Sequence, residues 1–275
     1  MIAVGVVVLA AALLVAFLFV SGAFTPGTST SPGTSYPTYR QALASGSSGA
    51  ASVAGGPWSP IFASGIRLGS NATLPASNLT ALASLTNCSV VWEGGFAPTL
   101  TLPATPASAG AGAAAFWTFA FVNSSGAAAL VIVTGSVATP LATISGSECR
   151  EVLLLLASLT SSTVVDSPVV AANASAVAAG WLLVHPDATE TFEITPGVDD
   201  ILTTPPVWHV ALSTCSLNAP AGSVGADFYA NLTAATGAVT AHGNGTGVCD
   251  DSSLAPALKI LPVAAGTVAP VRKAI

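Results

Sequence analysis

Few residues in this chain could support catalysis. There are three histidines, His185, His209 and His242, and twelve acidic residues among 275. A carboxylate and an imidazole can transfer protons when they are held within hydrogen-bonding distance. The acidic pairs Asp199-Asp200 and Asp250-Asp251 are adjacent in sequence. On a strand their side chains would point to opposite faces, so neither pair is a suitable acid/base couple, and we read both as polar turns.

Catalytic motifs with a known mechanism are absent from the sequence. It contains no H-E-x-x-H zinc site, no G-x-S-x-G nucleophile turn and no C-x-x-C pair. We therefore predict that the chain is not an enzyme and has no catalytic residue, metal site or cofactor. A secreted hydrolase with an unrecognised site stays an alternative. A cluster of Glu93, Glu190 or Glu193 with a histidine would favour that alternative.

The four cysteines indicate an oxidising compartment. Their number is even, which is typical of extracytoplasmic chains with structural disulfides. We favour the pairs Cys88–Cys149 and Cys215–Cys249, each closing one half of the chain. The two halves differ in where the first cysteine sits, so the other pairings remain open.

N-glycosylation sequons are the most specific signal in the chain. Of eight asparagines, seven begin an N-x-[ST] sequence, far more than the Ser and Thr content predicts. Such sequons are read on the extracytoplasmic side of the membrane, so the body of the chain is expected to face outside. The seven are Asn71, Asn78, Asn87, Asn123, Asn173, Asn231 and Asn244.

The first 24 residues read as a membrane anchor. Residues 2–20 carry no charge and only Gly5 is not strongly apolar. A helix of this length rises about 28 Å, close to the hydrocarbon thickness of a bilayer. The sequons orient it with its N-terminus inside, as a single-pass helix in contact with membrane lipid. A cleaved signal peptide and a pilin-like helix buried in a filament core are the alternatives.

Low charge excludes one class of partner. Only 7% of residues are charged and the net charge is −6, with no basic cluster. Binding to nucleic acid depends on Lys and Arg, so we predict none. Envelope proteins or glycans are the partners that a surface location allows, and the sequence names neither.

The remaining chain divides into a linker, two repeated modules and a tail. Residues 25–56 are rich in Pro, Gly, Ser and Thr, with a short helix near Arg40 to Ala51. Residues 57–149 and 150–250 are two extracellular modules, and residues 251–275 are a C-terminal tail. The repeat rests on three offsets of about 90 residues, which relate Ser77 to Ser167, Trp92 to Trp181 and Trp117 to Trp208.

We expect an α+β, β-rich fold in which each module packs a short helix on its own antiparallel sheet. A further helix, Glu151–Thr160, would link the modules. Alternating and β-branched segments indicate the strands. They are Ser89–Trp92, Thr99–Leu102, Phe116–Phe121, Leu130–Thr134, Thr139–Ile144, Leu182–His185, Glu190–Ile194, Val207–Ser213, Gly225–Leu232 and Ala238–His242.

The second module resembles PepSY-type domains over about 35 residues. WHVALS, from Trp208, is followed by GADFYANLTAATGAVTA, which is similar to the closing strands of that family. The family's turn carries an aspartate, whereas Ala235-Thr236-Gly237-Ala238-Val239 lacks an acidic residue. The resemblance implies a small, non-catalytic α+β module for binding or inhibition. In composition, the whole chain is similar to archaeal membrane-anchored surface glycoproteins.

These observations predict a tandem-repeat glycoprotein on the cell surface. It would be held in the cell membrane by one signal-anchor helix, with its C-terminal body outside. Its role would be structural or binding at the cell envelope. A filament subunit of the pilin kind is the alternative, although a Pro/Gly-rich linker directly after the helix argues against it.

Overall fold

Most of the body forms one antiparallel sheet of nine strands. A computed structural model describes residues 36–68, 72–75, 89–92, 99–102, 104–146, 163–195, 206–215 and 223–249. The strand order is β11-β10-β9-β8-β1-β5-β6-β7-β3. The strands are β1 (Trp58–Arg67), β3 (Ser89–Trp92), β5 (Phe116–Asn123), β6 (Ala128–Thr134), β7 (Val137–Ser145), β8 (Thr189–Thr195), β9 (Val207–Ser213), β10 (Ser223–Thr233) and β11 (Val239–Cys249).

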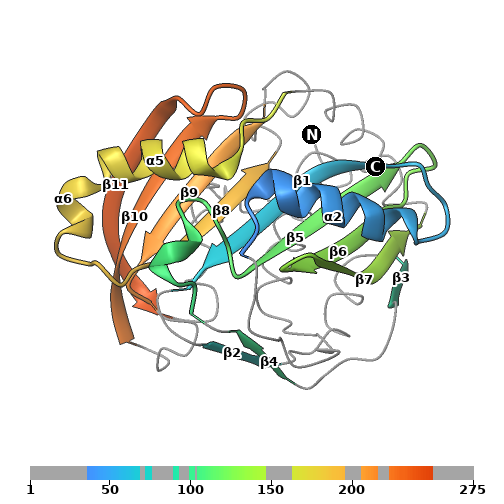
Figure 1. Cartoon of the computed structure of the whole chain (residues 1–275), viewed down its shortest axis with the longest axis horizontal. Helices are drawn as coiled ribbons and strands as arrows, with labels where there is room; N and C mark the ends of the chain where they lie inside the picture. Colours follow the sequence, from blue (N-terminus) through green and yellow to red (C-terminus); the bar gives the residue numbers. More distant parts are fainter. Residues whose placement is uncertain are drawn as a thin grey trace, which may run out of the picture.

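Two helices lie across the same face of this sheet (Figure 1). They are α2 (Tyr39–Ala51) and α5 (Ser167–Val177), and the short helix α6 (Ala179–Leu182) follows α5. A separate two-stranded sheet pairs β2 (Ala72–Pro75) with β4 (Thr99–Leu102), and a 3-10 turn, η1 (Ala107–Ala109), precedes β5. The opposite face of the large sheet has no described helix on it. We call it the helix-free face.

The two halves of the sheet share one plan. In the first half, α2 is followed by β1, β5, β6 and β7. In the second half, α5 is followed by β8, β9, β10 and β11. The halves join where β1 pairs antiparallel with β8, with Gly65 opposite Phe192. Trp117 in β5 and Trp208 in β9 occupy the corresponding second strands of the two series, and both are fully buried.

The predicted fold class is wrong in its architecture. Residues 57–149 and 150–250 do not each build their own small sheet; they contribute strands to a single one. The short helix expected near Arg40 to Ala51 is present as α2, and its Tyr39 and Ala42 lie buried in the core. An apolar helix face is stable only when it packs on another element, and here the sheet provides that element.

The correspondence between the two halves of the sheet differs in spacing from the predicted repeat. The N-caps of α2 and α5 are Thr38 and Asp166, 128 positions apart, whereas Trp117 and Trp208 differ by only 91. A long connection between β1 and β5 in the first half accounts for the difference. Trp92 and Trp181 do not correspond, since the first lies in the edge strand β3 and the second in α6.

Several predicted strands are confirmed. The segments Ser89–Trp92, Thr99–Leu102 and Val207–Ser213 match β3, β4 and β9. The strand predicted at Leu182–His185 is wrong, because α6 ends at Leu182 and a turn follows. A short apolar run does not distinguish a strand from a buried helix end. The predictions for residues 1–35, Glu151–Thr160 and the 251–275 tail lie outside the described residues.

No helix of the described part of the chain is long and apolar enough to cross a membrane. The predicted anchor, residues 1–24, is not among those residues.

The N-termini of both helices meet above the β1–β8 junction. One carboxylate oxygen of Asp166 accepts hydrogen bonds from the Arg40 and Ser167 backbone N–H groups, and the other accepts from the Thr38 hydroxyl, each at 2.9 Å. The Ser167 hydroxyl accepts from the Tyr39 N–H at 2.9 Å. These bonds satisfy N–H groups that a helix leaves unpaired at its start, and the negative charge lies at the positive ends of both helix dipoles.

Beneath this contact lies an aromatic cluster. The Tyr39 ring is 5.1 Å from Trp208 and 5.8 Å from Trp117 between centroids, both edge-on. Trp117 stacks on Phe192 at 6.0 Å, and its indole N–H donates to the Pro37 carbonyl at 2.8 Å. The cluster therefore contains residues from α2, β5, β8 and β9, which belong to both halves.

Gly65 makes this packing possible and yields a stability prediction. A Cβ at position 65 would lie 2.7 Å from three atoms of the Trp117 ring. We expect Gly65→Ala to lower the free energy of unfolding by about 1–3 kcal/mol, as overpacked core substitutions do.

Gly245→Ala is the matched control, because this strand glycine has no atom within 4 Å of an added Cβ. Urea denaturation of the two variants measures the difference. Equal midpoints for both variants would show that the Trp117 ring does not pack on Gly65 in this way.

Candidate functional site

Polar side chains form a row across the helix-free face. In each neighbouring pair of strands, the members of this row lie directly opposite each other in the register. Directly opposed residues of antiparallel strands point to the same face, with Cβ atoms about 5 Å apart. The row runs across β5, β1, β8, β9 and β10 as Thr118, Ser64, Glu193, His209 and Asn231. We call it the polar row.

The first half of the polar row is shielded from water. Thr118, Ser64 and Glu193 are all buried, and the Thr118 hydroxyl donates to the Ser64 carbonyl at 3.3 Å. The Ser64 hydroxyl has no hydrogen-bond partner in the described structure. A buried polar atom without a partner costs free energy, so it is unusual in a position that only has to pack.

Burial also changes the protonation of Glu193. Desolvation raises the pKa of this carboxyl from its ordinary 4.5 to about 8. Near neutral pH the side chain is therefore mostly the uncharged acid, which donates one hydrogen bond and can release a proton. Its direct neighbours in the row are the Ser64 hydroxyl and the His209 ring.

His209 is oriented by Asn231. Its Nδ1 lies 2.9 Å from the Asn231 Oδ1. Because a carboxamide oxygen only accepts, Nδ1 carries the hydrogen in this arrangement, and the imidazole is held in one tautomer. Burial lowers the pKa of His209, and the hydrogen bond to Asn231 opposes that shift. A neutral acid thus faces a neutral imidazole, which can bind a polar group or exchange a proton with it.

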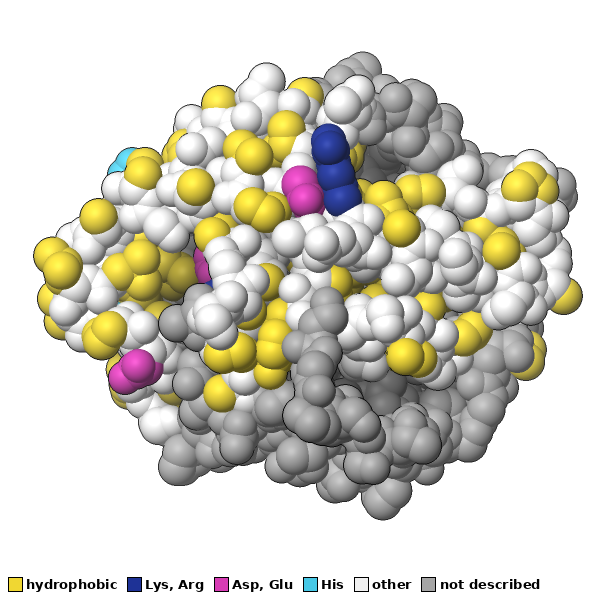
Figure 2. All heavy atoms as spheres, viewed as in Figure 1, with side chains coloured by type: hydrophobic (Ala, Val, Ile, Leu, Met, Phe, Trp, Pro, Cys, Tyr) yellow, Lys and Arg dark blue, Asp and Glu magenta, His cyan; other side chains and the backbone are white. Residues whose placement is uncertain are grey.

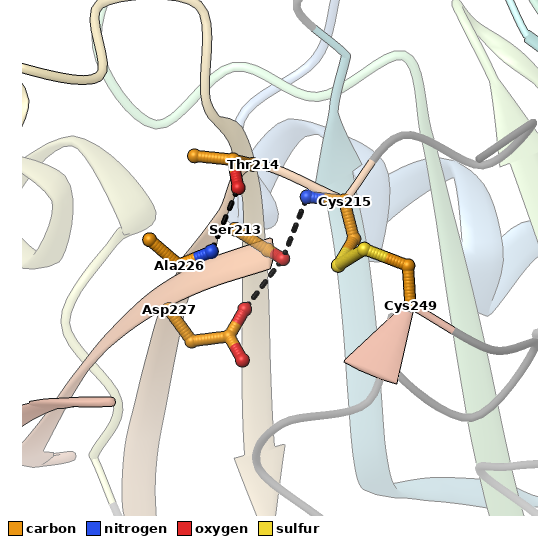
Figure 3. Close-up of a disulfide and its surroundings, with 6 residues drawn as sticks. All are labelled: Ser213, Thr214, Cys215, Ala226, Asp227 and Cys249. Carbon is orange, nitrogen blue, oxygen red and sulfur yellow. Dashed lines mark hydrogen bonds between the residues drawn. A yellow bond between two sulfur atoms is a disulfide. The ribbon is translucent and has the colours of Figure 1, made fainter. Parts of the chain in front are cut away.

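A second polar cluster lies at the other end of β9 and β10 (Figure 3). The Ser213 hydroxyl donates to the Asp227 carboxylate at 2.6 Å and accepts from the Cys215 N–H at 3.1 Å. The Cys215–Cys249 disulfide closes this end, with 5.5 Å between the Cα atoms. Gly225 lies against it, where a Cβ would come 2.3 Å from the Cys215 sulfur. The predicted pairing of Cys215 with Cys249 is confirmed, whereas Cys88 and Cys149 lie outside the described residues.

A third acid, Glu190, lies on the helix-bearing side of the sheet. It is buried opposite Arg67 in the β1–β8 register. Burial raises the pKa of Glu190 to about 7, and the Arg67 guanidinium moderates the rise. Arg67 donates its own hydrogen bonds to the Gly110 and Pro106 carbonyls. Figure 2 shows how few charged side chains this side of the molecule exposes.

The three histidines do not converge. His209 belongs to the polar row, His185 follows α6 and packs its ring 4.5 Å from Trp181, and His242 stacks on Phe228 in the β10–β11 hairpin. Within the described ranges, no group of three or more His, Cys, Asp or Glu side chains could hold a metal ion. Glu93 and the acidic pairs at 199–200 and 250–251 lie outside those ranges.

The described sequons differ in accessibility. Asn123 is 4% exposed and its Nδ2 donates to the Gly55 carbonyl at 2.7 Å. Asn173 is half-buried and its Nδ2 donates to the Gly237 carbonyl at 2.8 Å. Asn244 lies exposed on β11. Asn231 contacts His209, and Asn71, Asn78 and Asn87 lie outside the described residues. Glycosylation of all seven stays a prediction.

Comparison with protein-family models, curated proteins and solved structures finds no match to this chain.

The polar row could not have been assembled from the sequence. Glu193 and His209 were separate candidates, and only the β8–β9 register places them opposite each other. Ser64 went unnoticed because β1 contains Pro60 and Gly65, which are depleted in strands. Pro60 lies at an irregularity of the β1–β5 register, where a missing N–H is tolerated.

The raised pKa of Glu193 predicts how stability depends on pH. The folded state keeps this proton up to about pH 8, whereas the unfolded state loses it near 4.5. The contribution of Glu193 to stability is therefore greatest below pH 4.5, and it falls as pH rises toward 8. The slope for one proton is at most about 1.4 kcal/mol per pH unit.

Glu193→Gln should remove the contribution of this carboxyl to the slope of the free energy of unfolding against pH. The variant should therefore be more stable than wild type at pH 8. Glu190→Gln is the comparison, since its carboxyl shifts in the same direction but only to about 7. The lowered pKa of His209 has the opposite effect on the pH dependence of stability. Its contribution to the free energy of unfolding is lost as pH falls below about 6.5, the ordinary pKa of histidine. Denaturant titrations at pH values from 5 to 9 measure the free energy of unfolding for each variant. An unchanged slope in Glu193→Gln would refute the buried acid.

Burial also predicts which sequons carry glycans. In a glycosylating host we expect Asn244 to be occupied and Asn123 to be empty, because a glycan on Asn123 would displace a buried amide from its hydrogen bond. Glycopeptide mass spectrometry of the folded protein measures both. Full occupancy of Asn123 with an unchanged melting temperature would contradict the packing described around it.

Proposed function

We propose that this chain is a membrane-anchored, N-glycosylated extracellular protein with a structural or binding role at the cell envelope and no catalytic activity. The observation that carries the proposal is the Cys215–Cys249 disulfide, which joins the end of β11 to the residues after β9. Structural disulfides persist in oxidising compartments and are rare in the cytosol of most organisms. The body would accordingly lie on the outer side of the membrane.

Three features of the sequence support this location. The apolar segment 2–20 is long enough to anchor the chain, the sequons favour an exported body, and low charge suits a surface covered by glycans. The resemblance to archaeal surface glycoproteins and, in the second half, to PepSY-type modules points the same way. A pilin-like filament subunit remains the alternative for the same apolar segment.

The polar row is the proposed binding site of this body, and a partner would reach it from its half-buried end at His209 and Asn231. Its unpaired Ser64 hydroxyl and uncharged Glu193 offer hydrogen bonds without a charge to neutralise. Neutral donors and acceptors of this kind suit a hydroxyl- or amide-bearing partner such as an envelope glycan or peptide. Such a role needs no proton transfer, which agrees with the non-catalytic proposal.

One observation favours a second candidate, a hydrolase. Glu193 lies directly opposite His209, and Asn231 fixes the tautomer of that imidazole. This is the acid-with-histidine cluster that would support acid/base catalysis. Glu193→Gln and His209→Asn test it against panels of glycoside, ester and peptide substrates, with Glu190→Gln as control. Wild-type turnover that both row variants lose and the control retains would replace the non-catalytic proposal.

The proposed location is tested by fractionating cells that express the full chain. We expect the protein in the alkaline-carbonate-resistant membrane pellet, with its body cleaved by protease added to intact cells. Recovery in the soluble cytosolic fraction with four free thiols would contradict the proposal.

Loss of the disulfide should destabilise the body whichever role it has. The bridge spans 34 positions, and a closed loop of this size typically contributes about 2–4 kcal/mol to the free energy of unfolding. We expect Cys215→Ala/Cys249→Ala to lose stability in that range. Chemical denaturation measures it, with Cys88→Ala/Cys149→Ala as a parallel pair. A double variant as stable as wild type would show that the bridge is dispensable.

A further inference from the structure

Strand β11 forms an open edge of the sheet. It is the last strand in the order and runs for 11 residues, Val239–Cys249. No described segment pairs with its outer side, and most of its residues from Thr240 to Thr246 are exposed. Figure 1 shows it along one flank of the molecule, at the opposite end of the sheet from β3.

Alternation along β10 identifies which groups of β11 face outward. The Thr214 N–H donates to the Ala226 carbonyl at 3.0 Å, so even-numbered residues of this part of β10 bond toward β9. Odd-numbered residues of β10 then bond toward β11, where they lie opposite Ala241, Gly243 and Gly245. It follows that the backbone N–H and C=O groups of His242, Asn244 and Thr246 point away from the sheet.

Natural sheets block such edges, and among the described residues only one of the two edges of the large sheet has such protection. The opposite edge strand, β3, has four residues. Short edges, prolines and charged side chains are the usual protection against unwanted pairing. The sequence of β11, VTAHGNGTGVC, contains no proline and no Lys, Arg, Asp or Glu. Its one register irregularity lies near its start, opposite Asn231 and Leu232.

We propose that β11 pairs antiparallel with β11 of a second copy of this chain, which joins the two nine-stranded sheets into one. A strand that pairs with itself across a two-fold axis brings the residues nearest that axis close to their own copies, so a charge there would be repelled by its copy. An uncharged strand avoids this repulsion. The glycines at 243, 245 and 247 leave one face of the strand without side chains that could obstruct a neighbour.

The same kind of contact already exists inside the molecule. The two halves, each a helix with four strands in series, join edge to edge through β1 and β8 in antiparallel register. Pairing through β11 would repeat this arrangement between two copies. The proposal concerns assembly and holds whether or not the body is anchored or catalytic.

The test variant is His242→Pro in the full chain, purified in mild detergent. Proline removes the outward N–H of residue 242 and leaves the bonds to β10 in place, so the fold should survive. It also spares the sequon at Asn244. His242→Val keeps the N–H and controls for loss of the imidazole, and Asn244→Gln controls for a glycan at the edge.

Sedimentation equilibrium should show a dimer for wild type, His242→Val and Asn244→Gln. For His242→Pro we expect the dimer dissociation constant to rise by roughly tenfold or more, since each lost backbone bond is worth about 1 kcal/mol. Residue-resolved hydrogen exchange should show protected amides at His242, Asn244 and Thr246 at high protein concentration, and faster exchange on dilution.

A monomeric wild type at high concentration would overturn the proposal. A dimer that His242→Pro leaves unchanged would also overturn it, because association would then arise elsewhere, for example through the apolar segment 2–20. Outward amides protected only in the presence of another protein's strand would assign the edge to a different partner and likewise refute self-pairing.

Discussion

Asp166 accepts hydrogen bonds from the starts of both helices, and the arrangement of the two halves depends on this contact. Without Asp166, the Arg40 N–H at the start of α2 and the Ser167 N–H at the start of α5 would both lose their hydrogen-bond acceptor. Directly below, Tyr39 contacts both Trp117 and Trp208, whose strands come from different halves. Aromatic pairs of this kind add to the apolar area that they bury. The β1–β8 strand pair, the aromatic cluster and the helix ends therefore stabilise one another.

The two faces of the sheet carry different kinds of side chains. The helix-bearing face holds the aromatic core. The helix-free face holds the polar row, where hydroxyl, acid, imidazole and amide side chains lie side by side on five strands. Keeping an unpaired Ser64 hydroxyl and an uncharged Glu193 there costs stability. A protein that had to be only a rigid spacer would gain by replacing them with apolar residues, and for this reason we propose the binding site there.

Local patterns predicted much of the secondary structure. Alternation and β-branched residues located β9. Position in the sheet was not readable, because the β1–β8 pairing joins residues more than 120 positions apart and no local signal encodes it. The assumption that two similar segments fold separately led to the wrong architecture. Trp117 and Trp208, which the predicted repeat assigned to separate modules, meet in a shared core with 6.4 Å between their ring centroids.

The central claim is that both halves form one cooperative body across the β1–β8 junction. Differential scanning calorimetry of the full chain tests it most directly. A single body predicts one transition in which the calorimetric and van't Hoff enthalpies agree, and which Asp166→Ala shifts to lower temperature as a whole. Two separable transitions, of which Asp166→Ala moved only one, would contradict the account and restore two independent modules.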